Sequence, residues 1–258
     1  MRIREVTAED LPRLERLFGS RDLACAGPEL LWKLDNPGYV GACAVGEDEE
    51  LTAYYALLEV EVPAPDERVA VAVDAVTHPA HSSFGLIYDV MRACYRRSEE
   101  IGQELLLGIP TPAMQRVLEF VGWKPLRKHL VCISRADTEK LELRSGHGRS
   151  TETAYQRWRW DRCPRPYRHL AAGRNITFAE RPDIFPAPML MGGDAATRGE
   201  IEGKLEFCYL VPEDEAPAAS EILEELPVFY LYLAEPTPAE APKVSLDFSL
   251  VEALTLGW

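Results

Sequence analysis

The feature that most constrains the fold is a strand, a short loop and a long helix in direct succession. Residues 68–77 are mostly Val and Ala, the composition of a strand that is buried on both faces. A loop over residues 78–85 follows, and residues 86–100 carry apolar side chains at the spacing of an amphipathic helix. A buried strand that enters a helix in this way predicts a sheet with helices packed on its faces.

The flanking segments extend this pattern. We predict strands over residues 2–6, 40–45, 51–62, 104–107 and 130–134, and helices over residues 11–18, 28–35 and 112–121. Thr7 with Asp10 resembles a capping box at the start of the first helix, and Gly122 is expected to end the last one. The predicted fold class is therefore α/β, built on a mixed sheet.

The second half of the chain gives weaker signals. Residues 136–152 are polar, which predicts a linker between a domain over residues 1–135 and an accessory or degenerate domain over residues 153–258. In the latter we predict helices over residues 155–160, 195–207 and 216–225, and strands over residues 167–171, 175–179 and 228–233. The residues Trp-Lys-Leu-Asp at 32–35 recur as Trp-Arg-Trp-Asp at 158–161, which indicates a tandem arrangement with a shortened second copy.

Charge and cysteine content exclude several classes of protein. The 258 residues hold 28 Lys and Arg against 42 Asp and Glu, and the net charge of −14 opposes binding to nucleic acid. Arginines concentrate over residues 144–174, where they either pair with the acidic residues that follow or form a surface for an anionic ligand. The six scattered cysteines indicate buried thiols, with no metal site. Without a signal sequence or an apolar span, we expect a cytoplasmic protein that does not enter a membrane.

Residues 76–86 read Val-Thr-His-Pro-Ala-His-Ser-Ser-Phe-Gly-Leu. With the order of elements, this string makes the first 135 residues resemble the GNAT superfamily of N-acetyltransferases. In that family a buried strand ends in a His-Pro turn, passes through a phosphate-cradling loop and enters a long helix. The segments at 109–111 (Ile-Pro-Thr), 122–123 (Gly-Trp), 32–33 (Trp-Lys) and 36–37 (Asn-Pro) are similar to a subgroup that accompanies polysaccharide biosynthesis.

The resemblance implies an N-acyltransferase that uses acetyl-CoA or another acyl-CoA. The acceptor would be an amine of a small molecule such as an amino sugar, and a homodimer is compatible with this interpretation. The strand would pair with the pantetheine arm, while free N–H groups at the start of the helix would hold the pyrophosphate. The residues implied in cofactor binding are Ala75, Val76, Thr77, His81, Ser82, Ser83, Phe84, Gly85, Leu86 and Thr111.

Asp74 is the candidate catalytic residue, because it is the one carboxylate in an apolar strand and an acyl transfer to an amine needs a general base. The alternative is a structural ion pair with an arginine. The chain also departs from the family. Ser82 replaces an Arg or Gln in the loop, Ile87 replaces a small residue, and Leu118 stands where a Tyr often protonates the thiolate. These departures support a second hypothesis, a non-catalytic GNAT-like protein that binds a CoA-like ligand or a protein partner.

Overall fold

The computed structural model describes residues 1–23, 27–60, 67–135, 143–146, 158–159, 162–164, 167–170, 177–179, 185–190, 195–218, 220–233 and 241–242. The chain forms two compact units. Unit 1 contains Met1–Leu126 and the described residues from Phe229 onward, and unit 2 contains Arg127–Val228. Each unit is considered by itself.

Unit 1 is built on a mixed sheet. Its strands are β1 (Arg2–Glu5), β2 (Val40–Val45), β3 (Leu51–Val60), β4 (Val69–Thr77), β5 (Leu105–Gly108) and the end of β12 (Glu221–Tyr232). They lie in the order β1-β2-β3-β4-β5-β12. Neighbouring strands are antiparallel except β4 and β5, which are parallel. This confirms the predicted mixed α/β class and each predicted strand up to residue 108.

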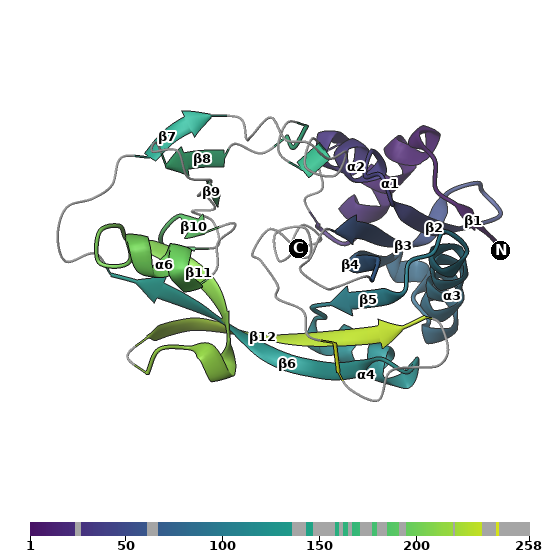
Figure 1. Ribbon diagram of the computed structural model, residues 1–258. Coiled ribbons are helices and arrows are strands. Elements are labelled where there is room, and N and C mark those ends of the chain that lie inside the picture. Colours follow the sequence, from purple (N-terminus) through teal and green to yellow (C-terminus); the bar gives the residue numbers. More distant parts are fainter. Residues whose placement is uncertain are drawn as a thin grey trace. The chain divides into compact units, whose positions relative to one another are not determined.

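Helices cover both faces of this sheet (Figure 1). They are α1 (Leu11–Gly19), α2 (Gly27–Leu34), α3 (Phe84–Glu100) and α4 (Pro112–Phe120). Side chains of adjacent strand residues point to opposite faces. Tyr54 on β3 packs against Phe18 of α1, and its neighbour Tyr55 packs against Tyr95 of α3. Helices α1 and α3 therefore lie on opposite faces of the sheet.

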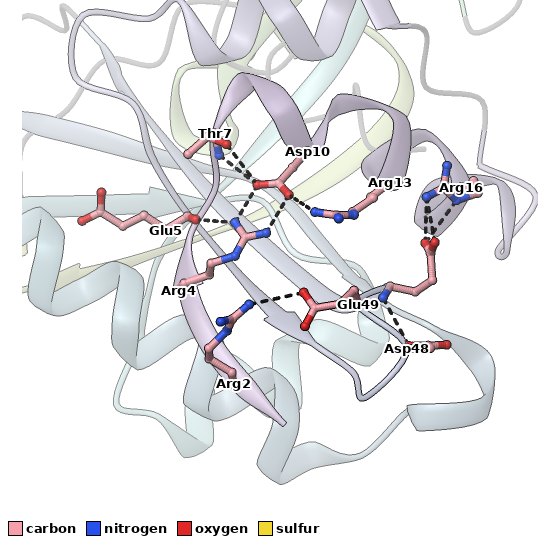
Figure 2. Close-up of polar contacts among 10 residues, drawn as sticks. Arg2, Arg4, Glu5, Thr7, Asp10, Arg13, Arg16, Asp48 and Glu49 are labelled. Carbon is pink, nitrogen blue, oxygen red and sulfur yellow. Dashed lines mark hydrogen bonds and ion pairs between the residues drawn. The ribbon is translucent and has the colours of Figure 1, made fainter.

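Polar contacts fix the start of the chain, as Figure 2 shows. The Thr7 main-chain N–H donates to Asp10 Oδ2 at 3.1 Å, which confirms the predicted capping pair. Arg4 donates to both carboxylate oxygens of Asp10 at 2.6 and 2.7 Å, and Arg13 adds a third contact at 3.2 Å. These hydrogen bonds lower the pKa of the Asp10 carboxyl to about 2, with the Arg4 contact as the largest cause. The network ties β1 to the beginning of α1.

Unit 2 is also built on a series of paired strands. The strands in it are β6 (Lys124–Ser134), β7 (Leu143–Gly146), β8 (Tyr167–Leu170), β9 (Thr177–Ala179), β10 (Met189–Leu190) and β11 (Phe207–Pro212), and α6 spans Ala195–Ile201. The strand order is β6-β11-β10-β9-β8-β7. Here β10 and β11 are parallel and the other neighbours are antiparallel.

The pairing pattern of unit 2 repeats that of unit 1. In each unit three antiparallel steps lead to one parallel pair, β4 with β5 or β10 with β11, and a helix connects the two parallel strands. Each unit then adds one antiparallel strand beside the second member of that pair, β12 in unit 1 and β6 in unit 2. The two similar tetrapeptides fall at matching places, since one precedes β2 and the other precedes β8.

Several predictions for the second half need correction. The helix predicted over residues 216–225 is wrong, because β12 begins at Glu221, and Pro227 within that strand would also interrupt a helix. The helix predicted over residues 195–207 ends at Ile201, before Gly203 with φ of +78°. The domain bounds and the linker stay predictions, while among the described residues β7 falls within the predicted linker and unit 1 ends at Leu126 before it resumes at Phe229. Most of the helix predicted over residues 155–160 lies outside the described residues.

Candidate cofactor cleft

The parallel strands β4 and β5 separate after three paired residues. The register joins residues 69–71 of β4 to residues 105–107 of β5. Strand β4 continues to Thr77 and remains paired with β3 over this length. Within the described part of the chain, residues 72–77 therefore have a strand neighbour on one side only. Such an opening leaves one edge of β4 free, as the pairing with a pantetheine arm implied by the family resemblance requires.

The open edge of β4 presents the main-chain groups of alternate residues. The His78 N–H donates to the Thr52 carbonyl at 2.8 Å, so these two residues form a hydrogen-bonded pair. Because an antiparallel ladder alternates, Val76 directs its N–H and C=O toward β3, whereas Ala75 and Thr77 direct theirs away from it. The main-chain groups of Val76 are therefore used within the sheet, and its assignment to the cofactor stays a prediction.

A cavity of about 190 Å³ occupies the opening between the two strands. Residues 72–75 of β4 line one side, and residues 108–111 with Met114 and Leu118 of α4 line the other. Tyr55 from β3 and Leu23 from the turn after α1 complete the lining. The walls are mostly apolar, as in sites that bind organic ligands, and the open edge of β4 supplies polar groups in fixed directions.

Beyond the cavity, the loop into α3 carries unused main-chain donors. In the described residues no acceptor contacts the N–H groups of residues 82–85. The Leu86 N–H, by contrast, donates to Ser83 Oγ at 3.3 Å, and the assignment of Leu86 to the cofactor stays a prediction. Four N–H groups at the positive end of a 17-residue helix favour an anion such as a pyrophosphate.

Side chains of the loop divide into structural and available groups. Ser83 caps α3, whereas Ser82 Oγ lies 3.1 Å from Thr77 Oγ1. A Cβ added at Gly85 would meet no atom within 4 Å, so the main chain there is open to a ligand. The Phe84 ring stacks on that of Tyr88, with 5.9 Å between the ring centroids. It also packs edge-on against the ring of Phe120 of α4, with 4.8 Å between the centroids. The Phe84 ring thus contacts neighbouring aromatic rings beside the loop.

Comparison with known proteins bears on this arrangement. No protein-family model matches the chain, and no curated protein matches its sequence. A GCN5-related N-acetyltransferase from Anabaena variabilis has a TM-score of 0.62 at 9% identity, over 90% of this chain and 73% of that one. One from Kribbella flavida has a TM-score of 0.59 at 13% identity, over 89% and 70%. A tandem GNAT protein from the clavulanic acid biosynthesis pathway has a TM-score of 0.56 at 11% identity, over 92% and 99%.

The chain has the GNAT fold. The similarity covers about nine tenths of the chain. At these identities the likeness establishes the fold, and the chemistry has to be argued from the residues of this chain.

The carboxylate of Asp74 is held by a residue that sequence analysis did not connect with it. Lys33 Nζ of α2 lies 2.8 Å from each Asp74 carboxylate oxygen, and both side chains are 0% exposed. The sequence alternative of an ion pair with an arginine was therefore right in kind, although the partner is a lysine. In this GNAT fold the pair joins α2 to β4 just where β4 leaves β5.

Two further residues of the cleft bear on proton transfer. Leu118 lies in the lining, so the position that often carries a Tyr in the family contributes no proton here. Tyr55 places a phenol in the same lining and is 1% exposed, and burial raises its pKa well above the usual range. Thr111 caps α4 by accepting a hydrogen bond from the Met114 N–H at 3.1 Å, as predicted, and also lines the cavity.

His81 lies apart from the cavity at β4. It lines a separate hollow of about 300 Å³ together with His78, Arg16 and residues 48 and 50–52. The centroid of its ring lies 5.6 Å from the ring centroid of His78. The assignment of His81 to the cofactor therefore gains no support from the cavity, although its main chain belongs to the loop.

The described residues bear on three of the wider expectations. Five cysteines are buried thiols, at positions 43, 94, 132, 163 and 208, while Cys25 lies outside the described residues. Across the part of the chain that the structure describes, no helix is both long enough and apolar enough to span a bilayer. The same residues contain no cluster of three metal-binding side chains. Most of the arginine-rich segment over residues 144–174 is outside the described part.

Sequence analysis missed Lys33, Arg21 and Tyr55 as parts of this region. In the sequence Lys33 belongs to the Trp-Lys pair quoted for the family resemblance, and Tyr55 is one of two adjacent tyrosines in a predicted strand. Arg21 carried no signal, because it belongs to a turn that is more than 50 positions from Thr77, which it contacts. Its pairing depends on tertiary contacts that no local pattern encodes.

Proposed function

We propose that the protein transfers an acyl group from an acyl-CoA, with acetyl-CoA as the first candidate, to an amine of a small molecule. The observation that carries this proposal is the opening between β4 and β5, with its cavity and its free main-chain edge, continuous with four unused N–H groups at the start of α3. The edge supplies donors and acceptors in line, and the loop supplies donors for an anion.

The free main-chain groups support a separate position for each part of such a ligand. Ala75 and the Thr77 N–H would pair with the amides of the pantetheine arm, as a peptide pairs with a free sheet edge, while the Thr77 carbonyl already accepts a hydrogen bond from Arg21. Residues 82–85 would hold the pyrophosphate through their N–H groups, for which the open space above Gly85 leaves room. The thioester would then lie in the cavity among residues 72–75.

The reaction joins the amine nitrogen to the thioester carbonyl carbon and breaks the carbon–sulfur bond. The amine loses a proton and the sulfur gains one. We propose Tyr55 as the donor to the sulfur, because it lines the cavity and its phenol carries an O–H that can donate a proton. Asp74 stays a prediction as the base, and its contact with Lys33 also fits a purely positioning role.

The experiment that tests the proposal is calorimetric titration of the full chain with acetyl-CoA. Gly85→Glu places bulk and negative charge in the proposed pyrophosphate site and should abolish micromolar binding. Gly199→Glu is the matched control, since a Cβ at that exposed position also meets no atom within 4 Å. Equal binding in all three proteins, or none by the natural sequence at millimolar ligand, would contradict the proposal.

An amine screen then tests transfer, with amino sugars as the first acceptors. Tyr55→Phe removes one hydroxyl and should lower kcat about 100-fold or more with little change in acetyl-CoA affinity. An unchanged kcat would remove Tyr55 from the mechanism.

A second candidate function is binding without catalysis. It is favoured by the engagement of Asp74 with Lys33 and by Leu118 in the cleft. Tight binding of acetyl-CoA with no turnover across the amine screen would support binding without catalysis over acyl transfer.

We also infer that unit 2 is a shortened second copy of unit 1. The repeated order of antiparallel and parallel pairs supports this inference, as do the similar tetrapeptides before β2 and β8. The buried Lys33 and the buried Arg159 hold the same place in the two tetrapeptides. In unit 2 the short β10 and the seven-residue α6 replace the long β4 and α3, so we place the proposed cofactor site in unit 1 alone.

A further inference from the structure

We propose that Arg21 supplies a positive charge to the phosphate cradle, the loop of residues 82–85 that would hold the pyrophosphate. The loop itself carries no such charge. This inference rests on the proposed binding of an acyl-CoA. The loop of residues 82–87 contains no Arg, Lys or Gln, so its own donors are main-chain N–H groups and two hydroxyls. A guanidinium that reaches the same place from another element would restore the missing cation.

The contacts of Arg21 place it where the strand becomes the loop. Its Nε donates to the Thr77 carbonyl at 2.7 Å, and its Nη2 donates to Thr77 Oγ1 at 3.1 Å. Thr77 Oγ1 in turn lies 3.1 Å from Ser82 Oγ, the first residue of the cradle. The guanidinium is thus one residue removed from the loop that would hold the pyrophosphate.

Arg21 also lies on the open side of β4. The ladder directs the Thr77 carbonyl away from β3, so the group that Arg21 binds faces the opening. Leu23, two positions later in the same turn, lines the cavity. The turn after α1 therefore borders the cleft with one apolar and one cationic side chain.

The charge of Arg21 is available to a ligand. Among the described residues no carboxylate lies within ion-pair distance of it, whereas Arg16 of α1 is paired with Glu50 at 2.8 Å. A guanidinium has five N–H donors, and the contacts with Thr77 use two of them. Three donors on an exposed side chain remain for phosphate oxygens, with which arginine makes strong charge-assisted hydrogen bonds.

The test compares a ligand that carries phosphate with one that carries none. Arg21→Gln removes the charge, and Arg16→Gln removes an equal charge five residues earlier as the matched control. We expect Arg21→Gln to weaken CoA binding about tenfold or more and to leave the affinity for pantetheine, measured by competition, unchanged. Arg21→Lys, which keeps the charge, should recover part of the loss, and the salt dependence of CoA binding should be smaller in Arg21→Gln.

Each outcome bears on the proposal. Equal CoA affinity in Arg21→Gln and the natural sequence would overturn it while the proposed function stands. Equal weakening of CoA and pantetheine would also overturn it, because Arg21 would then act only by holding Thr77. Absence of CoA binding by the natural sequence would overturn the proposed function, and the role of Arg21 with it.

Discussion

Replacing Asp74 tests whether its buried contact with Lys33 stabilises the protein or serves the chemistry. Both side chains are 0% exposed, and Lys33 Nζ contacts both carboxylate oxygens at 2.8 Å. Removing one partner leaves the other charge buried and uncompensated, at a cost of about 3–5 kcal/mol. Asp74→Asn and Lys33→Met should each lower the free energy of unfolding by an amount in this range.

The double variant Lys33→Met/Asp74→Val separates the two roles. It removes both charges and leaves apolar side chains in their place, a change that is often neutral or stabilising. We expect its free energy of unfolding to lie within about 2 kcal/mol of that of the natural sequence, which gives a large coupling energy in the double-mutant cycle. Urea unfolding at 15 °C, followed by tryptophan fluorescence, measures all four proteins, and Trp32 beside Lys33 is itself buried.

Acyl transfer by the same double variant then decides the role of Asp74. Retained transfer means that Asp74 positions α2 against β4, and lost transfer with retained acetyl-CoA binding means that it is the base. If Asp74→Asn alone changed the free energy of unfolding by less than about 1 kcal/mol, this reasoning would be refuted. A buried ammonium that has lost its partner should destabilise the fold by more than that.

Three further predictions concern stability. Burial lowers the pKa of His129 from its usual 6.5 to about 4. Because of this shift, the free energy of unfolding should fall by up to about 3 kcal/mol as the pH drops from above 6.5 toward 4. Urea unfolding of His129→Leu should show no such loss. The hydrogen bond from Arg4 lowers the pKa of Asp10, so this pair should contribute on the order of 1 kcal/mol above pH 4 that disappears toward pH 2 and is absent in Asp10→Asn. A chain that ends at residue 135 lacks the partner of β5, and size-exclusion chromatography should show aggregates, whereas a monomer would contradict the need for β12.

The fold of unit 1 was predictable because local patterns and tertiary structure agree there. The Val and Ala run of β4, the apolar stripe of α3 and the turn at Gly122 each specify one element, and each element formed within a few residues of its predicted bounds. In unit 2 the glutamates of residues 221–225 indicated a helix. Their strand is set instead by its continuation into the apolar residues 228–232, part of which pairs with β5.

The candidate site was predictable where it depends on the main chain. The separation of the strands and the free N–H groups at the start of α3 follow from the order of elements. Which residues of β4 face the opening depends on the register with β3, and the sequence carries no information on that register at Val76. The contacts of Lys33 with Asp74 and of Arg21 with Thr77 join residues more than 40 positions apart, beyond the reach of any local pattern.

The strand that completes the sheet of unit 1 is made long after the strand with which it pairs. Phe229 pairs with Gly108, 121 positions earlier. At about 5–20 residues per second, a ribosome needs about 6–24 s to add that stretch, during which β5 has no partner on one side. Pairs that distant also form slowly, since a long loop must close before the contact is gained. The sheet of unit 1 is therefore incomplete during this interval. We expect chaperones that shield exposed strand edges to affect the yield of this protein in cells more than its final stability does.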